Sequence, residues 1–261
     1  MYQVLLYVHI VCAVIWVGGA FYSQLLALRV ERSTDPADLP KLGRNLEFLG
    51  LRVFLPASIL PLYEARGRGE ISGFTVPAVN LRLLTYDTAR AAFRAARSLD
   101  AGAVVFEIAR SEIGYTDQRP GEYATVVLAA AARESWDHPV FLQGDHYQTN
   151  PKKMKEDPDK EIGAIQALID EAIPAGFFQI DIDTSTLVDL SQPNLAEQQA
   201  ANAIYSARLT EYIRKHEPAG MPISIGGEIG EVGKENSTAE ELRAYMNGYR
   251  NRIGDLRGLS K

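Results

Sequence analysis

Acidic side chains and one imidazole recur where short apolar runs of the sequence end. The segment "VFLQGDHYQ", residues 140–148, places Asp145 and His146 directly after such a run. Asp183 and Glu228 follow two later runs in the same way. Carboxylates that lie close together repel one another unless a cation shares them, so the pattern predicts a divalent-metal site.

Each of these residues also has a purely structural interpretation. An Asp after a strand most often caps the helix that follows, so one such residue carries little weight. Glu107, late in another apolar run, extends the series to four consecutive runs. Four successive runs that end in acidic or imidazole side chains favour one shared site over four separate caps.

The elements that would position these residues alternate regularly. Five runs rich in Val, Ile and Phe predict strands at 74–79, 103–109, 139–144, 177–182 and 222–227. Amphipathic segments predict helices at 85–99, 121–135, 159–173, 195–216 and 236–253. This alternation is the βαβ signature of a parallel sheet, either doubly wound or closed into a barrel. In a (β/α) barrel the carboxyl ends of the strands carry the active site.

Residues 69–261 resemble the class II, metal-dependent ketose-bisphosphate aldolases. "VFLQGDHYQ" is similar to that family's third-strand "H-L-D-H-G" segment, and "FFQIDIDTS" to its "M-I-D-x-S". "GGEIGEVGKEN" is similar to its "E-x-E-L-G…G-x-E-D", and "VFEIARSEIGY" to the second-strand segment of a subgroup. The resemblance implies an α/β fold that is a partial (β/α)8 TIM barrel, with about five βα units in this chain.

The resemblance also implies a metal centre. His146 would be a zinc ligand through its imidazole, and Asp183 would orient the site or hold a second metal position. Glu228 would be a metal ligand or its near neighbour. The cofactor would be Zn²⁺ or another divalent cation, which polarises the carbonyl of the substrate and stabilises the enediolate.

Three further residues take catalytic or binding roles by the same resemblance. Asp145 would protonate the aldehyde oxygen in the condensation direction. Glu235, on the loop after the fifth strand, would be the base that removes the proton from the ketose-derived carbon. Asn80, after the first strand, would contact the substrate. The implied reaction is retro-aldol cleavage or aldol condensation of a ketose (bis)phosphate.

The chain departs from the family pattern in two ways. Tyr147 stands where the family usually has Gly, and Gly144 replaces a bulky apolar residue, which leaves a sugar-acid (ketouronate) epimerase with the same chemistry as an alternative. The family's "G-T-x-H-G" segment and two further zinc-binding His are also unmatched. Residues 69–261 number about 190, whereas an eight-stranded barrel needs about 250. We therefore expect a C-terminally truncated barrel with impaired activity.

The first thirty residues differ from the rest. Residues 4–28 carry no Asp, Glu, Lys or Arg, and a helix of about 25 such residues exceeds the roughly 30 Å hydrocarbon core of a bilayer. We expect a membrane span, since a cleaved signal peptide fits less well without a preceding Lys or Arg. Arg29 and Arg32 follow the span, so the positive-inside rule places the downstream chain in the cytoplasm. Residues 46–63 predict a second apolar helix.

Residues 2–60 resemble the start of small copper-resistance-D-like integral membrane proteins, whose first helix carries an "H…W-x-G-G" pattern. This resemblance implies another alternative, a membrane protein with haem or copper at His9 and a non-catalytic soluble part. The expected organisation is a membrane helix region at 1–63, a junction at 64–68 and the barrel at 69–261. The chain would be membrane-anchored, or cytoplasmic if the first segment is a fusion artefact.

Composition limits the partners. The 261 residues are 46% hydrophobic with a net charge of −6, which describes a globular chain and argues against nucleic acid as a partner. The single Cys, Cys12, excludes a disulfide framework. The expected partners are a sugar phosphate or sugar acid and a membrane. An unclosed sheet edge would also allow homo-oligomers.

Overall fold

The structure is a computed structural model that describes residues 68, 70, 72–73, 75–219, 221–230 and 236–259. The chain divides into two units, Met1–Ser72 and Gly73–Lys261, and every described helix and strand belongs to the second. The expected membrane span at 4–28, the second apolar helix at 46–63 and the copper-resistance-D-like segment at 2–60 lie outside the described residues. Among the residues that are described, no helix has the length and apolar character to cross a bilayer.

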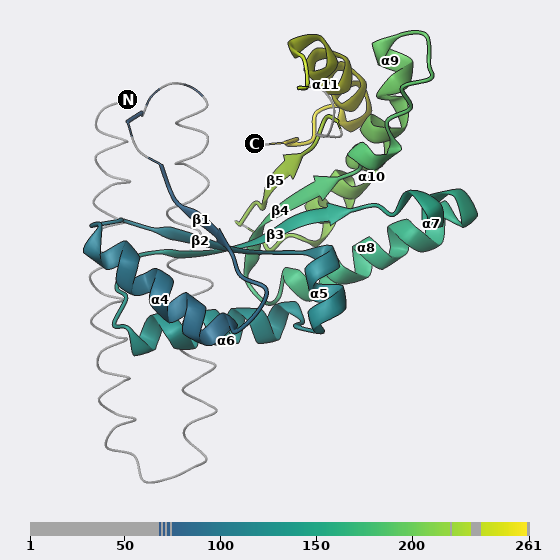
Figure 1. Ribbon diagram of the computed structural model, residues 1–261. Coiled ribbons are helices and arrows are strands. Elements are labelled where there is room, and N and C mark those ends of the chain that lie inside the picture. The colour runs from purple at the N-terminus through teal and green to yellow at the C-terminus, as the bar shows by residue number, and fades with distance from the viewer. Residues whose placement is uncertain are drawn as a thin grey trace. The chain divides into compact units, whose positions relative to one another are not determined.

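Five parallel strands form one sheet in chain order, as Figure 1 shows. They are β1 (Ala78–Asn80), β2 (Val104–Ala109), β3 (Val140–Gln148), β4 (Phe177–Asp183) and β5 (Ser224–Gly227). All five predicted strands are present, which confirms the α/β fold with a parallel sheet. A doubly wound sheet reverses its strand order at a switch point, and the described strands show no reversal.

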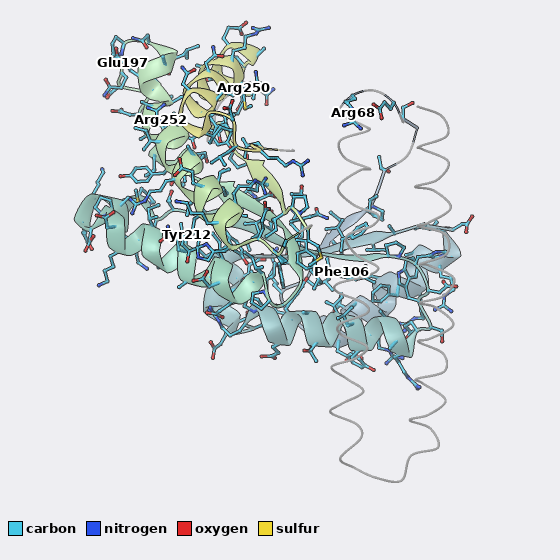
Figure 2. All side chains as sticks on the ribbon, turned by 180° about the vertical axis from the view of Figure 1, so that it is seen from behind. Arg68, Phe106, Glu197, Tyr212, Arg250 and Arg252 are labelled. Carbon is cyan, nitrogen blue, oxygen red and sulfur yellow. The ribbon has the colours of Figure 1, made fainter. Side chains whose placement is uncertain are left out.

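The five amphipathic segments form helices that pack beside one another in sequence. They are α4 (Thr85–Ser98), α6 (Pro120–Arg133), α8 (Pro158–Ala172), α10 (Ala200–His216) and α11 (Ala239–Ile253). Helix α4 contacts α6, α6 contacts α8, α8 contacts α10, and α10 contacts α11. Their outer faces carry exposed charged side chains such as Arg250 and Arg252 (Figure 2). The amphipathic pattern of α4, α6, α8 and α10 is therefore explained by one face in the core beside the sheet and one in solvent, whereas the apolar face of α11 packs against α10.

Four short elements complete the fold. They are α5 (Arg110–Thr116), α7 (Pro151–Glu156), the 3₁₀ turn η2 (Ser185–Leu187) and α9 (Leu195–Gln198). The sequence did not predict α5, α7 or η2, because elements of one or two turns give no periodic signal. Gln199 separates α9 from α10, so the predicted helix at 195–216 is two helices.

The start of α11 follows directly from its sequence. The Thr238 side chain accepts a hydrogen bond from the backbone N–H of Glu241, and the Glu241 carboxylate accepts one from the backbone N–H of Thr238. This reciprocal capping box satisfies two backbone donors that the first helical turn leaves unpaired. The sequence offers Ser237 or Thr238 as the cap of this helix, and the structure uses Thr238.

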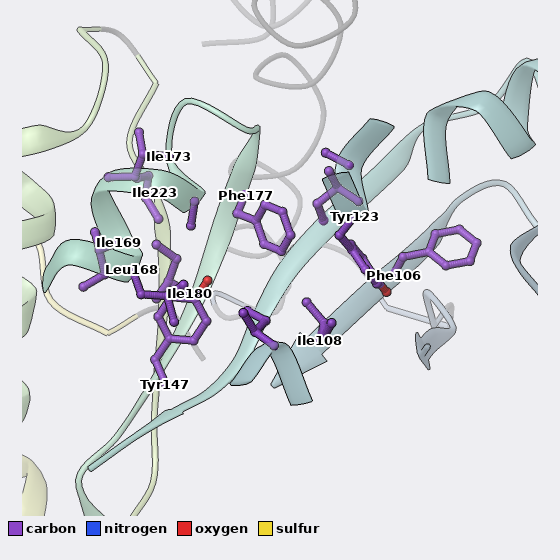
Figure 3. Close-up of a cluster of buried hydrophobic side chains, with 14 of the residues drawn as sticks. Phe106, Ile108, Tyr123, Tyr147, Leu168, Ile169, Ile173, Phe177, Ile180 and Ile223 are labelled. Carbon is purple, nitrogen blue, oxygen red and sulfur yellow. The ribbon is translucent and has the colours of Figure 1, made fainter. Parts of the chain in front are cut away.

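The hydrophobic core lies between the sheet and its helices (Figure 3). Phe106 and Ile108 on β2 point into this core, and each such side chain contributes about 1.5–3 kcal/mol when fully buried. Phe93 on α4 packs against Phe106, with ring centroids 4.8 Å apart. Glu107 lies between Phe106 and Ile108, and successive side chains alternate across a strand. The pleat therefore separates an apolar, helix-covered face from a face that carries polar side chains.

Two unusual neighbours on β3 explain the departures from the family pattern. The buried ring of Tyr147 lies over Gly144, so a Cβ built at Gly144 would be only 2.6 Å from two ring carbons. The large residue at 147 therefore requires the absence of a side chain at 144. Tyr147 is therefore part of the hydrophobic core.

A buried ion pair joins the start of α5 to the start of α8. Arg110 Nη1 lies 2.5 Å from Glu161 Oε1, and Glu161 also accepts a hydrogen bond from the Asn150 backbone N–H at 2.9 Å. Burial alone raises the pKa of Glu161, but Arg110 and the Asn150 N–H outweigh it and hold the pKa below its usual value. A carboxyl group with a depressed pKa stabilises the fold only while it is ionised.

We predict that Glu161→Gln lowers the free energy of unfolding by about 2–3 kcal/mol. This is less than the cost of breaking a fully buried ion pair, because Arg110 is partly exposed. The stabilisation by the Glu161 carboxylate is fully present above about pH 5. It is lost as the pH falls from the pKa of Glu in the unfolded chain, about 4.3, through the lower pKa of Glu161 in the folded chain. Urea unfolding at several pH values would measure both effects. Glu171→Gln, which breaks the exposed Arg119 pair, is the control and should cost about 0–1 kcal/mol. Equal effects in the two variants would contradict the prediction.

The Gly144 and Tyr147 contact gives a second prediction. Gly144→Ala should cost about 1–3 kcal/mol through overpacking, and most of this cost should disappear when Tyr147→Leu removes the ring. A double-mutant cycle measured by urea unfolding would show this coupling. Gly163→Ala, at a helical position with open space around it, should be neutral or stabilising. Additive effects of the Gly144 and Tyr147 substitutions would show that the close contact is absent.

Candidate active site

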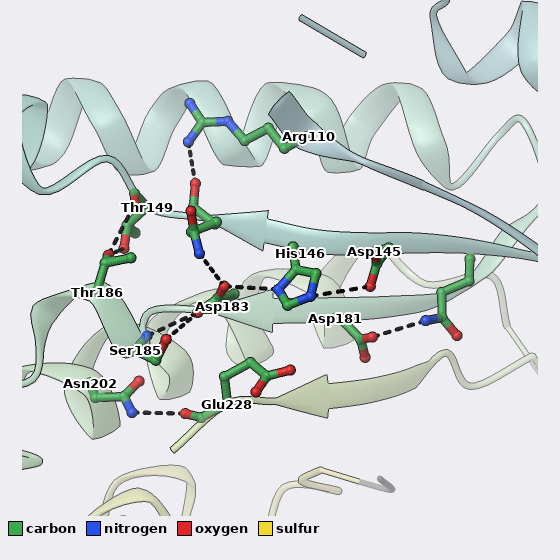
Figure 4. A network of polar contacts seen from close by, with 12 residues as sticks. Arg110, Asp145, His146, Thr149, Asp181, Asp183, Ser185, Thr186, Asn202 and Glu228 are labelled. Atoms are coloured by element: carbon green, nitrogen blue, oxygen red, sulfur yellow. Dashed lines mark hydrogen bonds and ion pairs between the residues drawn. The ribbon is translucent and has the colours of Figure 1, made fainter. Parts of the chain in front are cut away.

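The carboxyl ends of β3, β4 and β5 bring four of the predicted site residues together (Figure 4). Asp145 and His146 lie on β3, Asp183 is the last residue of β4, and Glu228 directly follows β5. His146 Nδ1 is 3.0 Å from Asp183 Oδ2, and His146 Nε2 is 3.8 Å from Asp145 Oδ1. The imidazole therefore lies between two carboxylates from neighbouring strands.

A β-bulge directs the side chain of His146. Gly144 pairs with Ile180 and Tyr147 pairs with Ile182, so β3 contains one more residue than β4 over this interval. His146 takes a left-handed backbone conformation with φ of 41°. For a residue with a side chain this conformation costs roughly 1–2 kcal/mol, and such strain is maintained where surrounding contacts fix the backbone. Bulges of this kind re-aim side chains near functional sites.

Because of the bulge, β3 ends later than the sequence predicted. The sequence placed Asp145 and His146 beyond a strand that ends at residue 144, whereas β3 continues to Gln148. Pairing resumes at Tyr147 because the bulge absorbs the extra residue. The Asp–His pair therefore lies within the strand instead of following it, at the point where the pairing of β3 with β4 is interrupted.

Asp183 is almost fully buried, accepts hydrogen bonds from three donor atoms and contacts the imidazole of His146. Asp183 Oδ2 accepts a hydrogen bond from Gln148 Nε2 at 2.6 Å and lies 3.0 Å from His146 Nδ1. Asp183 Oδ1 accepts hydrogen bonds from the Ser185 backbone N–H at 3.1 Å and from the Ser185 hydroxyl at 2.7 Å. Because an ionised carboxylate can only accept hydrogen bonds, we infer that His146 Nδ1 carries a proton. Asp183 is thus arranged to orient the imidazole.

The acidic surroundings shift the pKa values of the two most central groups. Burial lowers the pKa of His146, but the hydrogen bond to Asp183 and the charges of Asp145 and Glu228 outweigh it and raise the pKa above its usual value. Burial and the neighbouring Asp183 raise the pKa of Glu228, while His146 opposes this shift. The surroundings therefore favour the protonated form of both groups.

Helix α10 holds the end of β5 in place. Asn202 is fully buried, and its Nδ2 donates to the Glu228 backbone carbonyl at 2.8 Å. Its Oδ1 accepts a hydrogen bond from the Thr184 hydroxyl at 2.6 Å, directly after β4. Asn202 therefore ties the ends of β4 and β5 to one helix. No local pattern marks this role, since an Asn within an amphipathic helix usually lies in solvent.

Glu107 and Asp181 occupy a deeper position on the polar face. The side chain of Gln143 donates to Glu107 Oε2 and to Asp181 Oδ2, each at 2.9 Å. An amide that donates to two carboxylates satisfies part of their hydrogen-bonding capacity without a cation. Glu107, which extended the predicted series of acids, therefore belongs to this hydrogen-bonded group.

Of the two remaining predicted site residues, only Asn80 is among the described residues. Asn80 ends β1, two strands from β3, and its Nδ2 donates to Glu112 Oε2 at 2.9 Å. Glu112 also accepts the backbone N–H of Ala109 and pairs with Arg82 at 3.2 Å. Asn80 is therefore held by α5 and is separate from the His146 group. Glu235 lies outside the described residues.

The described donors do not fit a complete catalytic zinc site. Such a site normally takes three protein ligands, and no group of three or more His, Cys, Asp or Glu side chains within the described residues is placed to hold a metal ion. His138 packs against Trp136 before β3, and His216 stacks on Tyr212 at the end of α10. Of the described imidazoles, His146 alone lies at the carboxyl edge of the sheet.

Comparisons with known proteins place the chain in a family. Residues 67–249 match the family model for fructose-bisphosphate aldolase class-II. No curated protein matches the chain. A similar solved structure is that of a probable tagatose 6 phosphate kinase from Sinorhizobium meliloti 1021, with 22% identity and a TM-score of 0.49 over 69% of this chain and 44% of that chain. The present chain thus spans less than half the length of this structural relative.

Class II aldolases as a family use a divalent metal, typically zinc. The family model covers well over half of the chain, including every described strand. This chain therefore belongs to the class II fructose-bisphosphate aldolase family.

Proposed function

We propose that this chain carries out the proton transfers of an aldol-type reaction on a ketose phosphate, at the carboxyl edge of its sheet. The observation that carries the proposal is the His146–Asp183 pair, with His146 Nε2 directed toward Asp145. Family membership supports aldolase or epimerase chemistry in general. We also propose that the sheet is an arc of a (β/α)8 barrel, which its sequential strand order supports.

The reaction needs a group that moves a proton at an oxygen atom. In retro-aldol cleavage the neighbouring hydroxyl loses its proton and its carbon becomes an aldehyde as the carbon–carbon bond breaks. The electron pair of that bond passes to the ketose-derived fragment as an enediolate, which is then protonated at carbon. Asp145 would accept this proton as a carboxylate and would return it to the aldehyde oxygen in the condensation direction. His146, fixed by Asp183, would hold or donate a proton through Nε2 beside it.

The remaining roles stay proposals from the family resemblance. Glu228 would be a metal ligand or its near neighbour. Asn80 would contact the substrate away from the His146 group, and Glu235 would act as the base at carbon. The ketose phosphate, the division at 64–68 and the membrane anchor at 4–28 are likewise predictions.

We predict that Asp145→Asn and His146→Gln each lower retro-aldol turnover of fructose bisphosphate by about 10²-fold or more, because each removes a proton-transfer group. The assay measures release of triose phosphate by the full chain. Asp159→Asn, at an exposed position on α8, is the matched control and should leave turnover unchanged. Undetectable turnover in the unsubstituted chain, or unchanged turnover in both site variants, would refute the proposed function. Stereoisomers of the substrate in place of triose would identify an epimerase.

Zinc binding provides a separate test. Because a single imidazole lies at the edge of the described sheet, we predict weak zinc binding, at well below one tightly held ion per chain. Zinc titration of the full chain followed by metal analysis after gel filtration would measure this. His146→Ala should weaken the binding that remains, whereas His216→Ala, far along α10, should not. Tight one-to-one zinc that requires His146 would show that the site is complete and would overturn this proposal.

A further inference from the structure

Gln148, the last residue of β3, is held at both of its polar ends. Its side-chain Nε2 donates to Asp183 Oδ2 at 2.6 Å, and its backbone carbonyl accepts a hydrogen bond from Arg110 Nη1 at 2.6 Å. Gln148 is also the register partner of Asp183 in the β3–β4 ladder. The residue is therefore fixed directly beside the carboxylate that orients His146.

The two oxygens of Asp183 depend on different kinds of donor. Oδ1 is bonded by Ser185, two residues further along the chain, so this contact forms within the local turn. Oδ2 is bonded by Gln148 and contacts His146, which both come from β3. The direction in which Oδ2 faces the imidazole thus depends on the side chain of Gln148.

Gln148 also closes the bulge that exposes His146. The strained left-handed backbone at His146 persists only if the residues on both sides are held in place. On the far side the ladder resumes with Tyr147 and Gln148, and the side chain of Gln148 adds a second link to β4.

A chain of hydrogen bonds supports Gln148 from outside the site. Glu161 pairs with Arg110, Arg110 Nη1 donates to the Gln148 carbonyl, and Gln148 donates to Asp183. Asp183 Oδ2 in turn contacts His146 Nδ1. Each link joins a different element, from α8 through α5 and β3 to β4, so the position of the imidazole is coupled to the buried ion pair.

We propose that Gln148 is a positioning residue: it holds Asp183 Oδ2 against His146 Nδ1 and so keeps the proton on Nδ1 and Nε2 toward Asp145. The effect of Gln148 on catalysis rests on the proposed function, whereas its effect on the imidazole does not. The two can therefore be measured separately.

The test uses nitrogen-15 NMR of the histidine rings in the full chain, at a pH where the ring of His146 is neutral, with its signals assigned by their loss in His146→Gln. The unsubstituted chain should show the Nδ1–H form. Gln148→Met, which keeps the length of the side chain and removes its donor, should shift the ratio of the two tautomers toward Nε2–H by about tenfold. If Gln148→Met does not retain the far-UV circular dichroism of the folded chain, Gln148→Leu provides the same measurement, because it also removes the donor without adding a charge.

Gln192→Met is the matched control. Gln192 Nε2 likewise donates to an aspartate, Asp189, at 2.7 Å on an exposed turn, so its loss should leave the His146 signals unchanged. An unchanged tautomer ratio in folded Gln148→Met would overturn the proposal, and so would an equal shift in Gln192→Met. If the site is catalytic, Gln148→Met should also lower kcat about tenfold with little change in KM. A shifted tautomer without turnover in the unsubstituted chain would support the positioning role while refuting the proposed function.

Discussion

The burial of one carboxylate, Asp183, organises the candidate site. A buried charge costs several kcal/mol unless hydrogen bonds or opposite charge satisfy it, so donors must converge on it from the surrounding chain. Two come from Ser185 in the local turn, one comes from Gln148 and one is inferred at His146. The requirement to satisfy Asp183 therefore fixes the end of β3 against the end of β4. The position of the imidazole follows from this constraint.

The bulge in β3 reconciles this requirement with the hydrophobic core. It lets Tyr147 return to the helix-covered face while Asp145 and His146 stay at the polar edge, and Gly144 leaves room for the ring. Helix α10 then holds Glu228 opposite the pair through the buried amide of Asn202. Packing on one face of the sheet thus determines the arrangement of the reactive groups on the other.

Local patterns predicted much of the fold, because strand alternation, helix amphipathicity and the Thr238 cap depend on residues close in sequence. The bulge, Gln148 and Asn202 depend on partners 18 or more residues away, and no local signal marks them. The sequence also could not show that the described residues alone do not assemble a group of three metal ligands. Charge alone suggested that clustered carboxylates need a cation, yet much of their hydrogen-bonding capacity is met by N–H and O–H donors from Gln148, Ser185 and Gln143.

The orientation of the imidazole depends on the proton that His146 Nδ1 is inferred to share with Asp183. The most direct test is the nitrogen-15 NMR signature of His146 in an Asp183→Asn variant of the full chain. An Asn at this position can donate an N–H to Nδ1. We therefore expect the neutral ring to switch from the Nδ1–H to the Nε2–H tautomer. An Nδ1–H ring that persists unchanged in a folded Asp183→Asn variant would contradict it.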